Sequence, residues 1–335
     1  MSRSLRRALI AAALPFCVMV VPGAAGPPDA AGPRAGQVIG VGSLVHGVET
    51  LEKSLEYYRD VLGFEPLGTV PPAPIFDLPI QTLTNHGGAL HRTVTLKIPN
   101  SAVTLQLFEV TNGQPGTRSS LRQTTARPTD PGGAVLGIRV PSVATTFANI
   151  ERSRMADVLG VGGKPAGNVL FARNRDGAVT EVAQSDGSGT ADAASIVLTT
   201  AGDGLKLKFF KDVLGFDLKT GDWESGKDVM NAVGADTGMI RRSVGYVPGT
   251  KVRLEIDEYS GIPQKRAYYY YNSIPGAVTL QFVVRDIDDM VKIVRAEQVR
   301  IVTTGQQPVT IDHSRTVLVR DPDGLFIQLM EREQD

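Results

Sequence analysis

The stretch SLEYYRDVLGF at residues 54–64 returns later in the chain as KLKFFKDVLGF at residues 206–216. Both copies place two aromatic residues and a cation ahead of an identical DVLGF. A match of this length is not expected by chance, so the chain contains a duplicated unit.

The repeated stretch is typical of a helix that ends against a strand. Its apolar residues recur at helical spacing, and the glycine of DVLGF supplies the left-handed residue that ends the helix. Thr50 and Asp203 stand where N-caps are expected. The apolar stripe comprises Leu51, Leu55, Tyr58 and Leu62 in the first copy, and Leu207, Phe210 and Leu214 in the second. Both stretches are therefore predicted to be helices that pack on a core.

The rest of the chain predicts four similar modules, each with a first strand, a helix and further strands. In the first and third modules, hairpins are expected at 92–98 with 103–110 and at 242–247 with 252–258. In the second and fourth, helices begin at Ser142 and Asp286, and closing hairpins turn at 175–177 and 321–324. Two long connectors, 65–90 and 220–238, recur at the same place in the first and third modules. Each can form a short helix whose apolar residues must be buried, so we expect the connectors to fold over a cavity as lids. These residues are Ile75, Phe76, Leu78 and Ile80 in the first connector, and Val229, Met230 and Val233 in the second.

The repeated helix resembles that of the vicinal oxygen chelate (VOC) superfamily, which includes the glyoxalase, bleomycin-resistance and extradiol-dioxygenase proteins. Modules of that superfamily commonly end on a DPDG turn, as residues 321–324 do here. The resemblance implies an α+β fold of four βαβββ modules in two pairs, each pair forming a half-open curved sheet, or cup, with its helices outside. We expect neighbouring modules to pair, which gives a first VOC domain at 38–190 and a second at 191–335.

The resemblance also locates the places where metal-dependent members carry histidine and glutamate ligands. In the first pair these places hold Ser43, Val135, Gln106 and Glu181, and in the second pair Ser195, Thr279, Glu255 and Gln328. None is histidine, and one carboxylate in each cup with hydroxyl and amide groups is a poor transition-metal site. We therefore expect no metal and no cofactor. The predicted ligand-binding residues are Ser43, Gln106, Glu181, Ser195, Glu255, Thr279 and Gln328.

Other polar side chains leave alternatives open. Strand alternation points His46 away from the cup. His86 and His91 could reach a cavity mouth or be solvated loop residues, and His313 has the same alternatives. Arg92 and Arg242 follow the connectors, so each is either a surface cation or aimed at an anionic ligand. The run Tyr268–Tyr271 is either connector packing or a stacking platform.

The N-terminus predicts export. Residues 1–25 carry arginines, then an apolar run, then small residues, in the order of a signal peptide, and residues 26–37 form a flexible tether. The single cysteine, Cys17, lies in the segment expected to be removed, which excludes a disulfide scaffold and a thiolate site in the mature chain. The 35 basic and 35 acidic residues give no nucleic-acid or membrane-surface footprint. A homo-oligomer stays open.

Three functions follow from these observations. The first is metal-free binding or sequestration of a small-molecule ligand in the cups by an exported protein. The second is a glyoxalase-like or dioxygenase-like lyase or oxidoreductase with a reduced metal site, using Glu181 or Glu255 as general base. The third is an interaction module in which one pair is purely structural.

Overall fold

The computed structural model describes residues 38–111, 126–187, 192–267 and 269–333. The expected signal peptide, the tether and Tyr268 lie outside these residues. Within the described part of the chain, no helix has both the length and the apolar character needed to cross a membrane.

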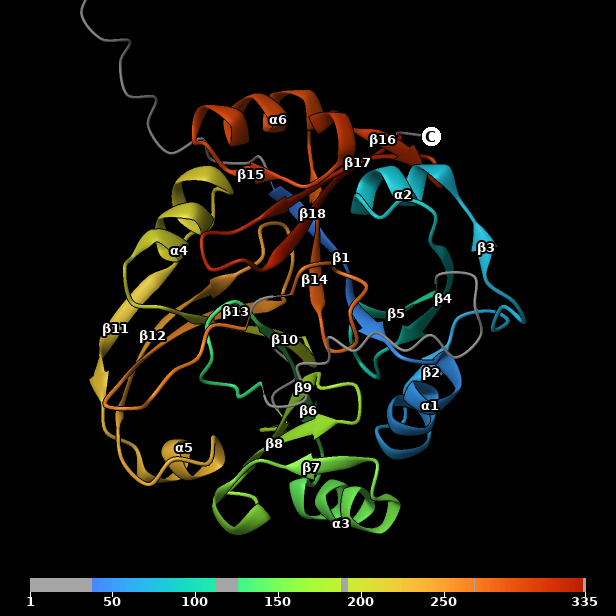
Figure 1. Ribbon diagram of the computed structural model, residues 1–335. Coiled ribbons are helices and arrows are strands. Elements are labelled where there is room, and N and C mark those ends of the chain that lie inside the picture. Colours follow the sequence, from blue (N-terminus) through green and yellow to red (C-terminus); the bar gives the residue numbers. More distant parts are fainter. Residues whose placement is uncertain (1–37, 112–125, 188–191, 268, 334–335) are drawn as a thin grey trace, which may run out of the picture. The chain divides into compact units, whose positions relative to one another are not determined.

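Four modules follow one another along the chain (Figure 1). The first contains β1 (Val38–Val48), α1 (Leu51–Leu55), β2 (Glu65–Pro66), β3 (Ile75–Phe76), α2 (Leu78–Thr84), β4 (Leu90–Lys97) and β5 (Thr104–Thr111). The second contains β6 (Ala134–Val140), α3 (Val143–Ser153), β7 (Ala156–Val158), β8 (Val169–Asn174) and β9 (Val179–Gln184). The third contains β10 (Ala194–Thr200), α4 (Leu205–Lys208), β11 (Lys219–Glu224), α5 (Lys227–Ala232), β12 (Met239–Tyr246) and β13 (Arg253–Ser260). The fourth contains β14 (Val278–Val284), α6 (Ile287–Ala296), β15 (Arg300–Ile301), β16 (Val309–Ile311), β17 (Ser314–Arg320) and β18 (Phe326–Arg332).

The modules form two curled sheets, but the expected pairing of neighbouring modules is wrong. Sheet A joins the first and fourth modules in the order β15-β17-β18-β14-β1-β5-β4-β2, with β16 on β17 and β3 on β4. Sheet B joins the third and second modules in the order β11-β12-β13-β10-β6-β9-β8-β7. The antiparallel pairs β1–β14 and β10–β6 join the two modules within sheet A and sheet B, respectively. Long segments separate β5 from β6 and β13 from β14, so chain connectivity permits either pairing.

Both copies of the repeated helix widen into a π-helical turn, at Glu56–Val61 and Phe209–Val213. The amide of Leu62 bonds to the carbonyl of Tyr57 at 3.1 Å, and that of Leu214 bonds to Phe209 at 3.1 Å. The wider turn lets two successive aromatic side chains enter the core, which ordinary helical spacing does not predict. All four aromatic residues, Tyr57, Tyr58, Phe209 and Phe210, are buried.

The expected ends of these helices are largely confirmed. Gly63 (φ 77°) and Gly215 (φ 79°) adopt the left-handed conformation. The Thr50 side chain caps α1, as expected. In the second copy the N-cap is Gly204, one residue later than expected, and the carboxylate of Asp203 accepts the Leu205 amide at 3.0 Å.

Alternate residues of each strand face opposite sides of its sheet. On one side, apolar side chains pack with the module helices in a continuous core that includes Leu44, Leu105, Leu136, Leu254 and Leu280. The other, concave side carries the residues between them and is the side that the two connectors approach.

The short helices of the connectors pack against concave-face residues, as the lid expectation requires. In sheet B, Met230 and Val233 of the α5 region cluster with Val135, Val179 and Val197.

In sheet A, Leu83 of α2 clusters with Leu318 and Phe326. Three residues that were expected to be buried in this connector, Ile75, Phe76 and Leu78, are instead exposed.

Candidate functional site

The pairing of modules regroups the seven predicted binding residues. Ser43, Gln106, Thr279 and Gln328 belong to sheet A, whereas Glu181, Ser195 and Glu255 belong to sheet B. The expectation of one carboxylate in each cup is therefore wrong. Both glutamates lie on the concave face of sheet B, on β9 and β13, and line the same pocket.

At the predicted binding positions the concave face of sheet A carries uncharged side chains, which largely bond to one another. Ser43 Oγ lies 2.7 Å from Thr104 Oγ1, and the Ser43 amide donates to Gln281 Oε1 at 2.9 Å. Gln281 Nε2 in turn donates to Gln328 Oε1 at 3.1 Å. These groups are already engaged, and none carries a charge.

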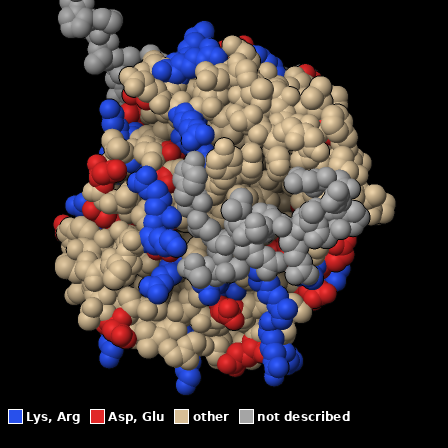
Figure 2. Space-filling view, in the orientation of Figure 1, with Lys and Arg blue, Asp and Glu red and all other residues tan. Residues whose placement is uncertain are grey.

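The concave face of sheet B carries a network of arginines and carboxylates. Arg242 Nε on β12 lies 3.0 Å from Glu255 Oε1, and Arg253 on β13 pairs with the other oxygen of the same carboxylate. Arg242 Nε also lies 3.9 Å from Asp257 Oδ1, and the Tyr259 hydroxyl donates to Asp257 Oδ2 at 3.2 Å. Figure 2 shows basic side chains gathered over the region where Figure 1 places β12 and β13.

A narrow pocket with about 20 Å³ of free space opens beside this network. Its polar lining is contributed by Arg139, Glu181, Ser195, Arg253 and Glu255, and its apolar lining by Ile138, Ala183 and Val197. Gly137 faces Ser195 across β6 and β10, and a Cβ at this glycine would lie 2.1 Å from Ser195 Oγ. The glycine therefore leaves the serine hydroxyl room to lie across the strand.

Burial and neighbouring charges change the acidity of two carboxyl groups here. Burial, reinforced by Glu255, raises the pKa of Glu181 to about 7, although Arg253, Arg139 and Arg242 oppose this shift. Burial and Glu255 also raise the pKa of Asp257 well above its usual value. At neutral pH Glu181 therefore lies near the midpoint of its titration.

Strand register aligns each position of sheet B with its duplicate in sheet A, and the duplicates are uncharged. Ser195 pairs with Arg253 as Ser43 pairs with Thr104, and Arg242 pairs with Asp257 as Thr93 pairs with Phe108. Six charged residues of sheet B have uncharged duplicates in sheet A. The pairs are Arg139 and Val283, Glu181 and Gln328, Arg242 and Thr93, Arg253 and Thr104, Glu255 and Gln106, and Asp257 and Phe108. Since sheet A forms without charges at these positions, the fold does not require them in sheet B.

The residues at the family's metal-ligand places do not fit a transition metal. In sheet A they offer two hydroxyls and two amides, and in sheet B a valine, a serine and two glutamates. Glu255 is already paired with two arginines. Over the described ranges, no three His, Cys, Asp or Glu side chains are grouped so that they could hold an ion. Imidazole or thiolate donors, which such ions prefer, are missing from all eight places.

The histidines have separate positions. His46 faces the helical side, as expected, with Nδ1 2.6 Å from the Tyr58 hydroxyl. His86 stacks on Tyr271 with ring centroids 4.3 Å apart, and His91 is buried beside Phe108. His313 is exposed, 3.6 Å from Glu333.

The run Tyr268–Tyr271 is partly buried in the connector between the third and fourth modules. Tyr269 is buried, whereas Tyr270 is exposed.

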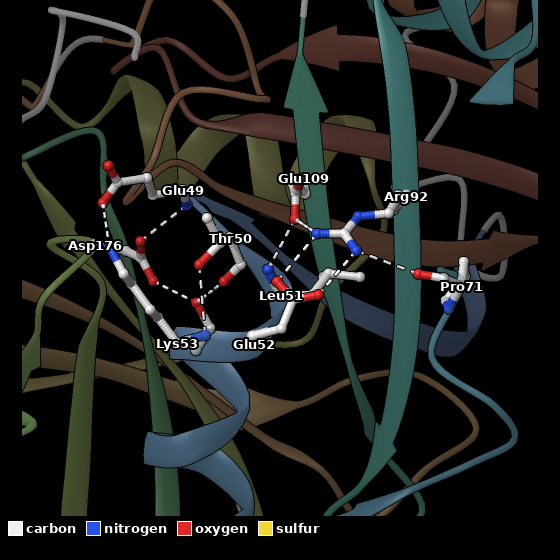
Figure 3. Close-up of polar contacts among 10 residues, drawn as sticks. Glu49, Thr50, Leu51, Glu52, Lys53, Pro71, Arg92, Glu109 and Asp176 are labelled. Carbon is white, nitrogen blue, oxygen red and sulfur yellow. Dashed lines mark hydrogen bonds and ion pairs between the residues drawn. The ribbon is translucent and has the colours of Figure 1, made fainter. Parts of the chain in front are cut away.

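Of the two arginines considered at the connectors, only Arg242 reaches a concave face. Arg92 lies on the helical side of sheet A, where it pairs with Glu52 and Glu109 and donates to the Pro71 carbonyl (Figure 3). Glu109 also accepts the amide of Leu51 at the start of α1. Arg92 therefore anchors a helix and a connector.

Arg139, Arg253, Asp257 and Tyr259 are site residues that sequence reasoning missed. Three of them, with Glu255, occupy alternate positions of one strand, and that period of two was the available signal. Arg139, two residues beyond Gly137, could not be assigned to the site from the sequence, because its assignment requires the knowledge that β6 lies beside β10.

Comparison with known proteins supports the architecture. No family model and no curated protein matches this sequence. Among solved structures, glyoxalase I from Zea mays superposes with a TM-score of 0.53 at 17% identity, covering 88% of this chain and 92% of that one. A putative dioxygenase from Bacillus subtilis superposes with a TM-score of 0.55 at 11% identity, covering 90% and 87%. The four βαβββ modules, their two curled sheets and these similarities show that the chain has the fold of the VOC superfamily.

Proposed function

We propose that this chain is an exported small-molecule-binding protein that uses the concave face of sheet B without a transition metal. The observation that carries this proposal is the charged pocket around Glu181 and Glu255, at positions whose duplicates in sheet A are neutral. Charged groups at positions where the fold does not need them are typical of recognition sites. Export rests on the order of charge, apolar run and small residues at 1–25.

The test is a screen of small metabolites by amide chemical shifts in the purified protein. We expect binders to shift resonances of β6, β9, β10 and β13. The variant Arg253→Thr, which introduces the residue of sheet A, should abolish these shifts. The matched change Thr104→Ser in sheet A should leave them intact.

Elemental analysis of the same purified protein tests whether it binds a transition metal. After dialysis we expect far less than one equivalent of zinc, iron or manganese by elemental analysis. A stoichiometric metal that is lost in Glu181→Ala or Glu255→Ala would contradict the proposal.

A second function, general acid–base catalysis, is favoured by one observation. Glu181 has no ion-pair partner within the described residues, and its pKa of about 7 suits proton transfer at neutral pH. If Glu181 acts as a base, bound carbon acids should exchange C–H protons with deuterated solvent, and Glu181→Gln should stop this exchange. Binding without exchange would leave the first function alone.

A further inference from the structure

We propose that a cavity between the first and second modules binds a short primary ammonium ion, at the place that a lysine side chain takes in the duplicate contact. The cavity lies between the repeated helix of the first module and the turn that joins β8 to β9. It shares no lining residue with the sheet B pocket, so this inference goes beyond the proposed function and does not depend on it.

The cavity has room for a small molecule. Its free space is about 160 Å³, against about 20 Å³ in the sheet B pocket. A single water needs about 10–15 Å³ of such space, so a molecule of several non-hydrogen atoms can enter. Four of the residues that line it are buried, namely Ser54, Tyr57, Asn174 and Asp176.

At the duplicate contact, between the third and fourth modules, the chain buries an ammonium group. Lys206 Nζ lies 3.0 Å from Asp321 and 3.3 Å from Asp323, and it donates to the Thr199 carbonyl at 2.9 Å. The lysine side chain has no exposed surface there. This junction of modules therefore holds an ammonium away from solvent when carboxylate and carbonyl oxygens surround it.

The first contact keeps an acceptor of this arrangement and replaces the lysine. Ser54 stands at the position of Lys206, and Asp176 at the position of Asp323. A lysine carries its ammonium on a four-carbon stem, of which serine keeps only the first carbon. The cavity that Ser54 and Asp176 line therefore corresponds to the space that the outer part of the lysine takes at the duplicate contact.

The charges around the cavity favour a cation. The buried Asp176 carboxylate accepts the Ser54 hydroxyl at 2.6 Å and the Glu49 amide at 2.9 Å (Figure 3). Glu49 also lines the cavity and adds a second carboxylate, with a side chain that is 17% exposed. The basic lining residues reach solvent: Arg175 is exposed, and Lys53 is 57% exposed and approaches Glu49 only to 3.9 Å. A ligand inside the cavity therefore meets carboxylates more closely than cations.

A buried hydroxyl group lines the same cavity. The Tyr57 hydroxyl and that of its neighbour Thr180 have no hydrogen-bond partner within the described residues. The duplicate of Tyr57 is Phe209, which has no hydroxyl. Leaving a buried hydroxyl unpaired costs free energy, and an ammonium has three N–H donors to offer. The tyrosine is therefore a polar group that the duplicate contact, with its own lysine, does without.

These features select the ligand class. The alkyl chain of the ligand replaces the lysine stem, and Met155 gives the cavity an apolar side for it. A quaternary ammonium lacks N–H donors, and an inorganic cation leaves the space of the stem unfilled. A primary alkylammonium ion of about three carbons reproduces the outer part of a lysine, so propylammonium is the appropriate probe.

The experiment titrates propylammonium chloride into the full-length protein at pH 7 and follows amide chemical shifts and the midpoint of urea denaturation. We expect saturable shifts centred on residues 49–57 and 174–177, and a higher urea midpoint, because the ligand binds only the folded chain. Two probes at equal concentration serve as controls, 1-propanol for chain length without charge and potassium chloride for charge without a chain. Both should bind at least about tenfold more weakly.

Variants test the place of binding. Ser54→Lys inserts the lysine of the duplicate contact and should abolish the shifts, whereas Ser225→Lys adds the same charge at an exposed position and should bind as the wild type does. Asp176→Asn removes the buried charge and should weaken propylammonium binding at least about tenfold, which keeps the test decisive if Ser54→Lys does not fold. Arg253→Thr, in the sheet B pocket, should leave propylammonium binding unchanged.

Three results would overturn the inference. The first is a wild-type protein in which propylammonium shifts none of these resonances. The second is binding that persists undiminished in folded Ser54→Lys or in Asp176→Asn. The third is 1-propanol or potassium binding as tightly as propylammonium, which would mean that the cavity does not select an ammonium on a chain. Each of these results leaves the proposed function of sheet B standing, since that function is measured on other strands and abolished by Arg253→Thr.

Discussion

Glu181 shows how strongly one residue depends on its surroundings. It occupies a place where its duplicate is Gln328, an amide that bonds to Gln281. In sheet B, glycine stands opposite Glu181 in the strand pairing where Gln281 stands opposite Gln328. The carboxyl group therefore faces a buried pocket instead of an amide partner, and its pKa rises.

This shift predicts a pH-dependent stability. The pKa of Glu181 is about 7 in the folded chain against 4.5 for an unperturbed glutamate, so the folded state holds the proton more tightly. The free energy of unfolding therefore falls as pH rises from about 4.5 through 7. Glu181→Gln should be more stable than the wild type at pH 8 by about 1–3 kcal/mol, and the difference should vanish near pH 4.

Urea denaturation at pH 4, 6 and 8 measures this difference. The exposed Glu65→Gln serves as control and should track the wild type at every pH. A Glu181→Gln variant that is less stable than the wild type at pH 8 would show that the carboxylate is stabilised by its arginines and not penalised by burial.

At the scale of elements, hydrophobic spacing predicted most of the structure. The first strands and hairpin strands of the modules, the α3 and α6 helices and the glycine stops follow from local periodicity and capping, which are properties of neighbouring residues. The strand β11 was not predicted, because its residues were assigned to a connector. The π-turn does not, because it depends on whether the core accepts both Tyr57 and Tyr58. For the same reason the buried face of α2 was misassigned: Leu83 is buried only because the fourth module lies beneath it.

The two lid helices give a contrasting pair of substitutions. Met230 of α5 is buried against the apolar end of the sheet B concave face, whereas Leu78 of α2 is 62% exposed. Met230→Ala should lower the free energy of unfolding by about 2–4 kcal/mol through a cavity. Leu78→Ala should change it by less than about 0.5 kcal/mol.

Urea denaturation compares these variants, and hydrogen exchange locates the effect. Faster exchange in Met230→Ala should be confined to Lys227–Ala232 and the strands beneath it. Equal losses in both variants would mean that α2 is buried as deeply as α5.

The whole molecule depends on which modules pair, and this could not be derived from the sequence. Each first strand can join the first strand of any other module, since all four carry the same alternation. The seven site residues were located by resemblance, but their division into an uncharged set on sheet A and a charged set on sheet B follows from the pairing. Arg139 and Glu181 belong to the second module, whereas Arg253 and Glu255 belong to the third, so only the assembled sheet B brings the two pairs together.

Two equivalent contacts link modules of different sheets. In the first, Ser54 Oγ of the repeated helix donates to Asp176 at 2.6 Å, and Asp176 also accepts the Glu49 amide at 2.9 Å (Figure 3). In the second, the fully buried Lys206 lies 3.0 Å from Asp321 and 3.3 Å from Asp323, and it donates to the Thr199 carbonyl at 2.9 Å. The duplicated sequence aligns Ser54, Asn174 and Asp176 with Lys206, Asp321 and Asp323.

This equivalence predicts how the buried lysine can be replaced. Lys206→Ser removes the cation and leaves two buried aspartates facing each other, which should cost about 3–5 kcal/mol of stability at pH 7. Burial already raises the pKa of Asp323 although Lys206 opposes the shift, so without the lysine Asp323 should protonate more readily. The cost should therefore shrink as pH falls from 7 to 4.

The double variant Lys206→Ser with Asp321→Asn recreates the first contact at the second site. It leaves a single aspartate beside a serine hydroxyl and an asparagine, the arrangement that Ser54, Asn174 and Asp176 already form. It should recover at least about half of the loss at pH 7, because one buried charge remains and has a hydroxyl donor. Urea denaturation of the single and double variants at pH 4 and 7 decides the matter. A double variant as unstable as the single one at pH 7 would show that the lysine stabilises the contact by filling space as well as by charge, and that the two contacts are equivalent in sequence only.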